Sequence, residues 1–426
     1  MILHVVKPGD SIYTIAKRYA VPPADIIRDN RLADPNRLVV GQTLVIMKDV
    51  TEHTVLPGES MYSIARKYGV TLEELRNANP QITNPAAIMP GQVVLIPVPP
   101  QKLGTIAVNG YALPNISMDA LKDTLPFLTY LSIFSHEVRP DGSLSSVSDE
   151  PLIRASRQAG VAPIMVITNL EEEGGFSGEL AHTILTNDAV QETLINNVID
   201  ELKDKNYAGL NIDFEYIPRG DRENYNRFIE KAAPRLRALG YILLSALAPK
   251  ISADQPGLLY EAHDYPVHGR IMDYVILMTY EWGYLYGEPM AVAPLNEVQR
   301  VLDYAVTAIP SEKILMGMPN YGYDWTLPYA RGTAAHTLSN TGAVTLAAKE
   351  NAAIQFDATA QAPFFYYYDE ERRRHVVWFD DARSTRARLS LVSQYNLGGV
   401  SYWTINRYFP QNWLVLSSMY NIKKVL

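Results

Sequence analysis

Apolar runs of strand length alternate with longer helical stretches from residue 103 to the end of the chain. Eight runs are rich in β-branched and aromatic residues, and segments with apolar residues at helical spacing separate them. These runs lie at residues 104–112, 130–138, 162–170, 209–216, 242–249, 274–282, 314–322 and 398–406. Because this alternation is typical of parallel strands joined by helices, eight repeats predict an α/β fold, a (β/α)₈ barrel.

One segment breaks the alternation. Between residues 325 and 383 the predicted strands lie too far apart, and FFYYYDEERRRHVVWFDD reads as two aromatic strands joined by a charged turn. We therefore expect a small α+β insertion beside the cleft of the barrel. A last helix is expected near residues 384–396.

The first hundred residues contain an internal repeat. VVKPGDSIYTIAKRYAVPPADIIRDN at 5–30 matches TVLPGESMYSIARKYGVTLEELRNAN at 54–79. In each copy a Pro-Gly turn precedes Ser11 or Ser60, whose hydroxyl can start a helix, and apolar residues then recur at helical spacing. Each copy is predicted to fold as strand, helix, helix, strand. The predicted domains are two modules at 1–48 and 52–97, a Pro-rich linker at 98–103 and the barrel at 104–426.

Composition narrows the range of partners. A formal net charge of −8 argues against nucleic acid, and a neutral ligand fits better. The chain has no Cys, and its eight His show no metal-binding spacing, so we expect neither a metal site nor a cofactor. The start of the chain lacks the pattern of a signal peptide, and no apolar run is long enough for membrane insertion.

The stretch LNIDFEY at 210–216 alternates apolar and polar residues. Asn211, Asp213 and Glu215 share one face, because successive side chains of a strand point to opposite faces. An edge strand facing solvent would show the same pattern, but a closed barrel has no edges. We therefore expect this polar face to point into the barrel, with Glu215 nearest the carboxyl ends of the strands, where such barrels carry their active sites.

The repeat resembles the LysM module, which binds glycans that contain N-acetylglucosamine. The resemblance implies a groove between the loop after the first strand and the loop before the last. The implied glycan-binding residues are Gly9, Asp10, Ser11, Ile12 and Asn30 in the first copy, and Gly58, Glu59, Ser60, Met61 and Asn79 in the second. A purely structural interpretation stays open, in which the glycines permit tight turns and the serines cap helices. Two weak sites on one tether would raise apparent affinity through effective concentration.

YAGLNIDFEYIP resembles the D-x-x-D-x-D-x-E signature of family 18 glycoside hydrolases, whose Glu is the catalytic acid. Asp213 and Glu215 match this signature, whereas Ala208 and Asn211 replace its first two acidic residues. Two further strands agree with the family, with MTYE where M-x-Y-D is usual and a Trp where one forms the floor of the sugar subsite. The residues concerned are Met278, Thr279, Tyr280, Glu281 and Trp403.

This resemblance implies a retaining hydrolysis without an enzymic nucleophile. Glu215 would protonate the glycosidic oxygen, and the acetamido oxygen of the substrate would attack the anomeric carbon. Asp213 and Tyr280 would orient the acetamide, and Trp403 would stack on the ring. The full predicted site comprises a catalytic set of Glu215, Asp213, Tyr280 and Asn211, and a substrate-binding set of Trp403, Met278, Glu281 and Tyr321.

The double LysM, NIDFEY and VNGY together resemble the spore-cortex-lytic and spore-germination N-acetylglucosaminidases of spore-forming bacteria. The implied partner is peptidoglycan or a related N-acetylglucosamine polymer, with spore-coat proteins as further candidate partners. The implied location is the spore, with the cell wall or the exterior as the alternative. A LysM-anchored chitinase and a non-catalytic glycan-binding coat protein are the competing hypotheses, although retention of Glu215, Asp213 and Tyr280 argues against the second.

Overall fold

The computed structural model describes residues 1–99, 101–171 and 174–426. The chain divides into two compact units. The first comprises Met1–Gly104, Gly322–Ala387 and Phe409–Tyr420, and the second Thr105–Tyr321, Arg388–Tyr408 and Asn421–Leu426. Among the described residues, no helix combines the length and the apolar character needed to cross a membrane.

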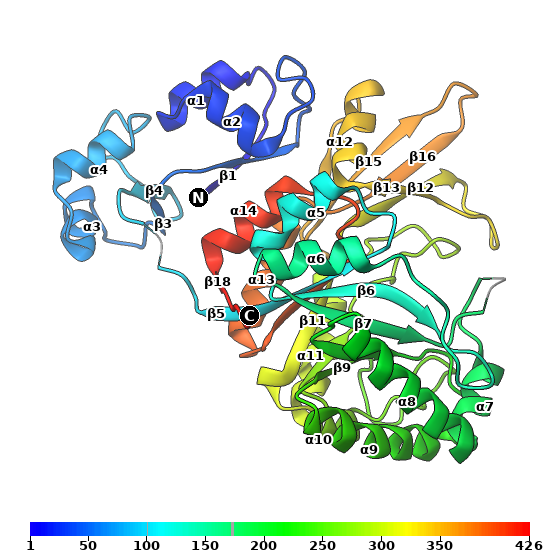
Figure 1. The fold of residues 1–426 in the computed structure, drawn as a ribbon. Coiled ribbons are helices and arrows are strands. Elements are labelled where there is room, and N and C mark those ends of the chain that lie inside the picture. The colour runs from blue at the N-terminus through cyan, green and yellow to red at the C-terminus, as the bar shows by residue number, and fades with distance from the viewer. Residues whose placement is uncertain (100, 172–173) are drawn as a thin grey trace. The chain divides into compact units, whose positions relative to one another are not determined.

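The second unit is a closed barrel of parallel strands (Figure 1). Its strands, in order around the barrel, are β5 (Thr105–Ala112), β6 (Tyr130–Glu137), β7 (Ala162–Thr168), β8 (Gly209–Asp213), β9 (Ile242–Leu247), β10 (Tyr274–Leu277), β11 (Ile314–Pro319) and β17 (Gly399–Trp403). β17 pairs with β5 and closes the barrel, and the short β18 (Asn421–Ile422) also pairs with β5. All eight predicted strands, and the barrel they form, are confirmed.

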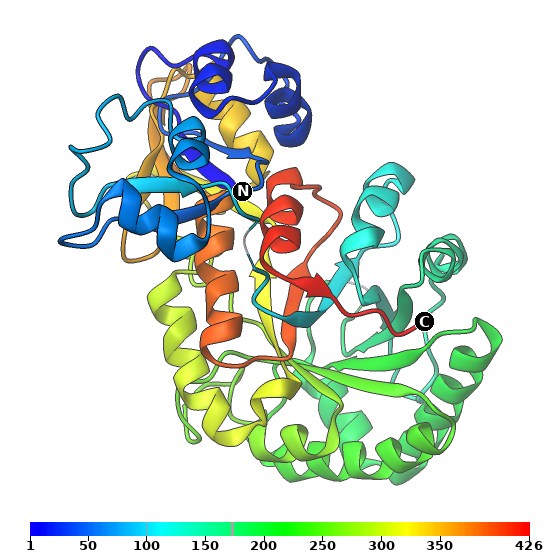
Figure 2. The same cartoon turned by 90° about the vertical axis from the view of Figure 1, so that its left-hand side faces the viewer.

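Helices lie outside the barrel strands (Figure 2). They are α5 (Met118–Thr124), α6 (Glu150–Gln158), α7 (Gly178–Thr186), α8 (Asp188–Asp204), α9 (Arg222–Ala238), α10 (Tyr265–Ile271), α11 (Leu295–Ala308) and α13 (Ala382–Gln394), with the short 3₁₀ helices η1 (Leu125–Phe127), η2 (Arg219–Asp221) and η3 (Ser311–Lys313). Local sequence sets their starts. The side chain of Asn187, for example, accepts hydrogen bonds from the N–H groups of Ala189 and Val190 and so caps α8.

Apolar side chains fill one part of the barrel interior, and polar side chains fill the next. The apolar part includes Ala107, Ile164, Val166, Leu244, Ile276 and Leu315. Farther along β5, Asn109 donates to the Ser401 hydroxyl at 2.9 Å and accepts from the Ser132 hydroxyl at 2.8 Å. On β8, Asn211 donates to the Tyr111 hydroxyl at 2.5 Å. The inward face of β8 is therefore polar, and its asparagine is stabilised by a hydrogen bond within the barrel.

The two repeats in the first unit have the predicted order of elements. The first contains β1 (Ile2–Val5), α1 (Ile12–Tyr19), α2 (Pro23–Asn30) and β2 (Thr43–Ile46), and the second β3 (Thr51–Thr54), α3 (Met61–Tyr68), α4 (Leu72–Ala78) and β4 (Val93–Ile96). Ser11 and Ser60 cap α1 and α3 in capping boxes, as their positions predict. Of the linker predicted at 98–103, residue 100 lies outside the described residues.

The inserted segment forms a five-stranded sheet with one helix, also in the first unit. Its elements are β12 (Tyr321–Leu327), β13 (His336–Ser339), α12 (Asn340–Lys349), β14 (Gln355–Asp357), β15 (Ala362–Tyr368) and β16 (Arg374–Trp378), and α14 (Pro410–Met419) belongs to the same unit. The predicted aromatic hairpin is confirmed, because β15 and β16 pair antiparallel with Phe364 opposite Trp378. The sheet begins earlier than the predicted boundary at 325, because β12 starts directly after β11.

Candidate active site

A cavity of about 610 Å³ lies at the carboxyl ends of the barrel strands. Six of the eight residues predicted for the catalytic and substrate-binding sets line it together: Asp213, Glu215, Met278, Tyr280, Glu281 and Trp403. They come from the ends of three strands, β8, β10 and β17, or from the residues just beyond. The barrel thus brings together side chains that lie nearly 200 residues apart in the sequence.

The other two predicted residues do not line the cavity. Each is hydrogen-bonded to another side chain of the barrel. Asn211 is fully buried and bonds to Tyr111 beneath the cavity. Tyr321 is 4% exposed, and its hydroxyl donates a hydrogen bond to the Glu281 carboxylate. Asn211 and Tyr321 are therefore positioned to orient site residues, and their direct contact with substrate is not supported.

The carboxyl groups of Asp213, the last residue of β8, and of Glu215, two residues beyond it, both line the cavity, where Asp213 is buried and Glu215 is half-buried. Asp213 is 4% exposed, and burial raises its pKa to about 7. Burial also raises the pKa of Glu215 well above its ordinary value, and the nearby carboxylates of Asp213 and Glu281 raise it further. These effects favour the protonated form of Glu215, which is the form that a general acid needs.

Two residues that the sequence analysis missed hold the backbone around Glu215. Asn169, at the end of β7, accepts from the Glu215 N–H at 2.9 Å and donates to the Glu215 carbonyl at 2.8 Å. His263 Nε2 donates to the Phe214 carbonyl at 3.0 Å, while its Nδ1 accepts from the Ala248 N–H at 2.9 Å. Asn169 could have been found, because it is a polar residue at the carboxyl end of a predicted barrel strand.

Aromatic rings and a buried hydroxyl complete the floor of the cavity. Trp403 packs edge-on against Tyr111 and Phe134, with ring centroids 5.3 and 4.8 Å apart. Burial raises the pKa of Tyr280, and the negative charges of nearby carboxylates add to the effect. Its hydroxyl is therefore protonated and can donate a hydrogen bond to a ligand.

Residues beyond the strands supply the rest of the lining, most of them from loops, with Glu297 and Arg300 from α11. These residues include Phe176, Tyr216, Gln255, Tyr260, Trp282, Tyr284, Glu297 and Arg300. Arg300 donates to Glu297 at 2.8 Å. Sequence spacing did not identify most of this set, because loop conformation decides which side chains turn toward the cavity. Tyr323 and Trp378 lie opposite each other in paired strands of the inserted sheet.

One cluster in the described part of the chain has the composition of a metal site. It contains His136, Asp149 and Glu201, none of which lines the cavity. The Lys205 ammonium lies 2.9 Å from Asp149 and 2.7 Å from Glu201. Because a cation already pairs with both carboxylates, we interpret the cluster as an ion-pair network.

The predicted LysM groove residues divide by burial. Gly9, Ser11, Gly58 and Ser60 are exposed. Asp10 and Glu59 are held in their turns, since each carboxylate bonds a histidine of the preceding strand, at 2.9 and 2.6 Å. The exposed turns therefore remain the candidate glycan contacts.

Four other groove residues have structural roles, which corrects the expectation from sequence. Ile12 and Met61 are 6% and 2% exposed and pack in the module cores. Asn30 and Asn79 are 4% and 0% exposed, and each amide bonds to the helix before it and the strand after it. Sequence spacing did not reveal that the two asparagines are buried, because a residue at the end of a helix is as often exposed as buried.

Known protein families match both parts of the chain. The description "Glycosyl hydrolases family 18" matches residues 167–407, and "LysM domain" matches residues 4–46 and 53–97. The chain therefore belongs to glycosyl hydrolase family 18, and it is a glycoside hydrolase that carries two LysM domains.

Individual relatives match over the full length of the chain. The cortical fragment-lytic enzyme of Bacillus subtilis (strain 168) is 42% identical over 431 residues, covering 100% of this chain and 99% of the relative. The enzyme of the same description from Bacillus anthracis is 38% identical, covering 98% of each. The crystal structure of the Bacillus megaterium QM B1551 spore cortex-lytic enzyme SleL has a TM-score of 0.90 at 42% identity, covering 100% of this chain and 99% of that one.

Proposed function

We propose that this protein hydrolyses the glycan strands of spore-cortex peptidoglycan as a retaining β-N-acetylglucosaminidase, while its LysM modules hold it to the glycan. The observation that carries the proposal is Glu215, a carboxylic acid with a raised pKa that lines a cavity together with Asp213, Tyr280 and Trp403. The full-length similarity to cortical fragment-lytic enzymes supports the choice of polymer. We further propose that the protein acts in the spore, and its interaction with spore-coat proteins stays a prediction.

The chemistry begins with a proton transfer. Glu215 donates its proton to the glycosidic oxygen, and the acetamido oxygen of the same sugar attacks the anomeric carbon to give an oxazolinium ion. The leaving chain departs with the proton. Glu215, now a carboxylate, then accepts a proton from the water that opens the oxazolinium ion, and the product keeps the original anomeric configuration.

Three neighbours give this reaction its geometry. Asp213 faces the acetamide nitrogen, orients the group and stabilises the positive charge that develops on it. Tyr280 donates its hydroxyl to the acetamide oxygen, and Trp403 stacks beneath the sugar ring. Because Asp213 is buried, its interaction with that charge is stronger than it would be in water.

Chitin offers the same reacting sugar, so chitin hydrolysis is the competing activity. A chitinase from Chromobacterium violaceum is 25% identical over 74% of this chain, with a TM-score of 0.68. The two substrates differ in the neighbouring sugar, which is a muramyl residue in peptidoglycan. Turnover of purified cortex fragments compared with chitin oligomers separates the two activities.

The test of the proposal is the Glu215→Gln variant, with Glu223→Gln, at an exposed position of α9 that does not line the cavity, as its matched control. Mass spectrometry follows products released from purified cortex peptidoglycan, and co-sedimentation measures binding. Glu215→Gln should lose at least 10³-fold in turnover while still binding, because the amide has no acidic proton to donate. Glu223→Gln should keep most of its turnover. Hydrolysis by Glu215→Gln at a rate near that of the wild type would refute the assignment.

A further inference from the structure

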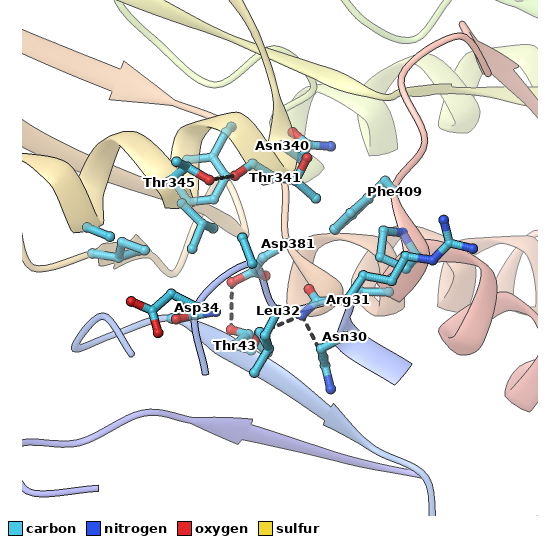
Figure 3. Close-up of a pocket in the computed structure, with 18 of the residues that line it drawn as sticks. Asn30, Arg31, Leu32, Asp34, Thr43, Asn340, Thr341, Thr345, Asp381 and Phe409 are labelled. Atoms are coloured by element: carbon cyan, nitrogen blue, oxygen red, sulfur yellow. Dashed lines mark hydrogen bonds between the residues drawn. The ribbon is translucent and has the colours of Figure 1, made fainter. Parts of the chain in front are cut away.

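Two cavities of the described chain differ in how their walls are built. In the first unit, a cavity of about 280 Å³ lies between helix α12 and the segment after α2, and a hydrogen bond of 2.7 Å from Thr43 to Asp381 helps to hold its wall (Figure 3). One wall of the active-site cavity is instead a long loop, residues 248–264, with neither helix nor strand between β9 and α10. Loops of this length are uncommon in compact domains and are usually functional. The groups that hold this loop in place therefore bear on the reaction.

The loop lines the cavity beside the catalytic acid. Its lining residues are Pro249, Ile251, Gln255, Leu259 and Tyr260. Because β9 pairs with β8, the loop begins beside the strand that leads to Glu215. His263, near the end of the loop, donates from Nε2 to the Phe214 carbonyl at 3.0 Å. The loop is thus bonded directly to the residue before Glu215.

A buried lysine ties this loop together from within. Lys250 is 1% exposed, and its ammonium donates to the carbonyl oxygens of Ala253 at 3.0 Å and His263 at 3.1 Å. Burying an ammonium is costly unless hydrogen bonds replace those that it made to water, and both of these bonds go to the backbone of the loop. Burial also lowers the pKa of Lys250, which reflects the same cost. The side chain therefore joins the early part of the loop to its end.

Further hydrogen bonds fix the ends of the loop. The Tyr265 hydroxyl donates to the Ala248 carbonyl at 2.6 Å and accepts from the Lys250 N–H at 2.8 Å. Near the start of the loop, the Gln255 side chain accepts from the Ile251 N–H at 2.7 Å. Lys250 itself is not among the residues that line the cavity. Any effect of its side chain on the reaction must therefore pass through the loop.

The loop lies on the side of the cavity where the leaving chain would go. β8 and β17 lie four strands apart in either direction around the barrel, so Glu215 and Trp403 lie on opposite sides of its mouth. Trp403 would stack beneath the reacting sugar, whereas Glu215 would protonate the oxygen that joins this sugar to the leaving chain. The leaving chain must therefore pass close to Glu215, and the loop after β9 lies beside that residue.

We propose that Lys250 is a positioning residue, which holds the 248–264 loop as the wall that binds the first sugar of the leaving chain. The inference rests on the proposed function, because it names the part of the glycan that this wall contacts. Gln255 and Tyr260 supply hydrogen-bonding side chains to the wall, and Ile251 and Leu259 supply apolar surface. Without the ammonium, the loop loses both bonds that cross its interior. Binding of the leaving sugar then weakens, while the chemistry at the reacting sugar is kept.

The test is steady-state hydrolysis by the full chain of two substrates, soluble cortex fragments and a chromogenic aryl N-acetylglucosaminide, whose leaving group carries no sugar. Lys250→Met removes the ammonium and keeps a long side chain. Its KM for the fragments should rise at least tenfold. For the aryl glycoside, KM and kcat should stay within threefold of the wild type, because Asn169 still holds Glu215. An equal rise in KM for both substrates, or no rise for either, overturns the proposal.

The matched control is Lys313→Met. Lys313 also donates to backbone carbonyls, those of Gly269 at 2.9 Å and Met272 at 2.8 Å, but it lies just before β11 and does not line the active-site cavity. This variant should keep the wild-type KM for both substrates, and the same KM for fragments in both lysine variants contradicts the proposal. Tyr265→Phe, which removes the hydroxyl between the ends of the loop, is a milder second variant and should raise the KM for fragments at least threefold.

Amide hydrogen exchange measures the stability of the loop without any substrate. Exchange in residues 251–263 should be at least tenfold faster in Lys250→Met than in the wild type, and unchanged in Lys313→Met. Unchanged exchange in Lys250→Met would show that the ammonium does not hold the loop, which also overturns the proposal. Because this measurement involves no hydrolysis, its failure is distinct from failure of the proposed function.

Discussion

Asn169 offers a sharp test of how the fold positions the catalytic acid. Its side chain makes three hydrogen bonds to backbone groups, at 2.9 and 2.8 Å with Glu215 and at 2.9 Å with the Ser177 carbonyl. Asn169→Ala removes all three. At a net value of about 1 kcal/mol each, the loss of stability should be about 3 kcal/mol.

The effect on catalysis should be separate from the effect on stability. Without the two hydrogen bonds from Asn169, the Glu215 backbone is free to move, and a displacement of about 1 Å costs on the order of 10²-fold in rate. We therefore expect kcat of Asn169→Ala to fall about 10²-fold while KM changes little, because Trp403 and Tyr280 still hold the sugar. The basic limb of the pH profile should move to lower pH, since a more hydrated Glu215 loses part of its raised pKa.

The assay is steady-state hydrolysis of a chromogenic N-acetylglucosaminide across pH, with urea unfolding measured in parallel. Asn187→Ala is the matched control, since it removes the cap of α8 at a cost of about 1 kcal/mol without touching the site. It should keep the wild-type kcat. If Asn169→Ala retains kcat within threefold of the wild type and an unchanged profile, the positioning role is refuted.

Three further predictions follow from buried polar groups. Asn211→Asp should change the pH profile of kcat/KM more than the maximal rate, because it places an ionisable group beside Asp213; an unaltered profile would contradict this. Tyr280→Phe should lower kcat about 10²-fold, as loss of a transition-state donor does, and kinetics within threefold of the wild type would argue against the role. Burial lowers the pKa of His268 to about 3, below the unfolded value of about 6.5, so its contribution to stability is complete above pH 6.5 and is lost as pH falls. In the wild type, this histidine should lower the free energy of unfolding by about 2 kcal/mol between pH 7 and 5, and His268→Phe should abolish that part of the decrease. Urea unfolding of the variant with the same pH dependence as the wild type would contradict this.

The barrel could be predicted because its sequence pattern is strong and regular. Each strand is a short apolar run, and Asp213 and Glu215 alternate with Ile212 and Phe214, so the spacing alone assigns them to one face. The repeat near the amino end was equally clear, because Ser11 and Ser60 occupy the same helix-capping position.

Other features depend on tertiary packing that no local pattern encodes. Asn169 contacts Glu215 across 46 positions of sequence, and only the pairing of β7 with β8 brings them together. Asn30 and Asn79 were predicted to contact glycan, yet they are buried because each ties a helix to the following strand. The different surroundings of Gly41 and Gly91 were also hidden. A Cβ on Gly41 would lie 1.9 Å from the Ile354 carbonyl oxygen of the inserted segment, whereas one on Gly91 would meet nothing within 4 Å. The sequences of the two repeats agree at this position, so only the inserted segment distinguishes them.

The most direct test of the central claim compares two aryl β-glycosides that differ only at carbon 2, one with an acetamido group and one with a hydroxyl. If the substrate supplies its own nucleophile to a bond that Glu215 protonates, the acetamido sugar should be hydrolysed at least about 10³-fold faster, since a well-placed internal nucleophile has a very high effective concentration. Equal rates for the two sugars would contradict the mechanism.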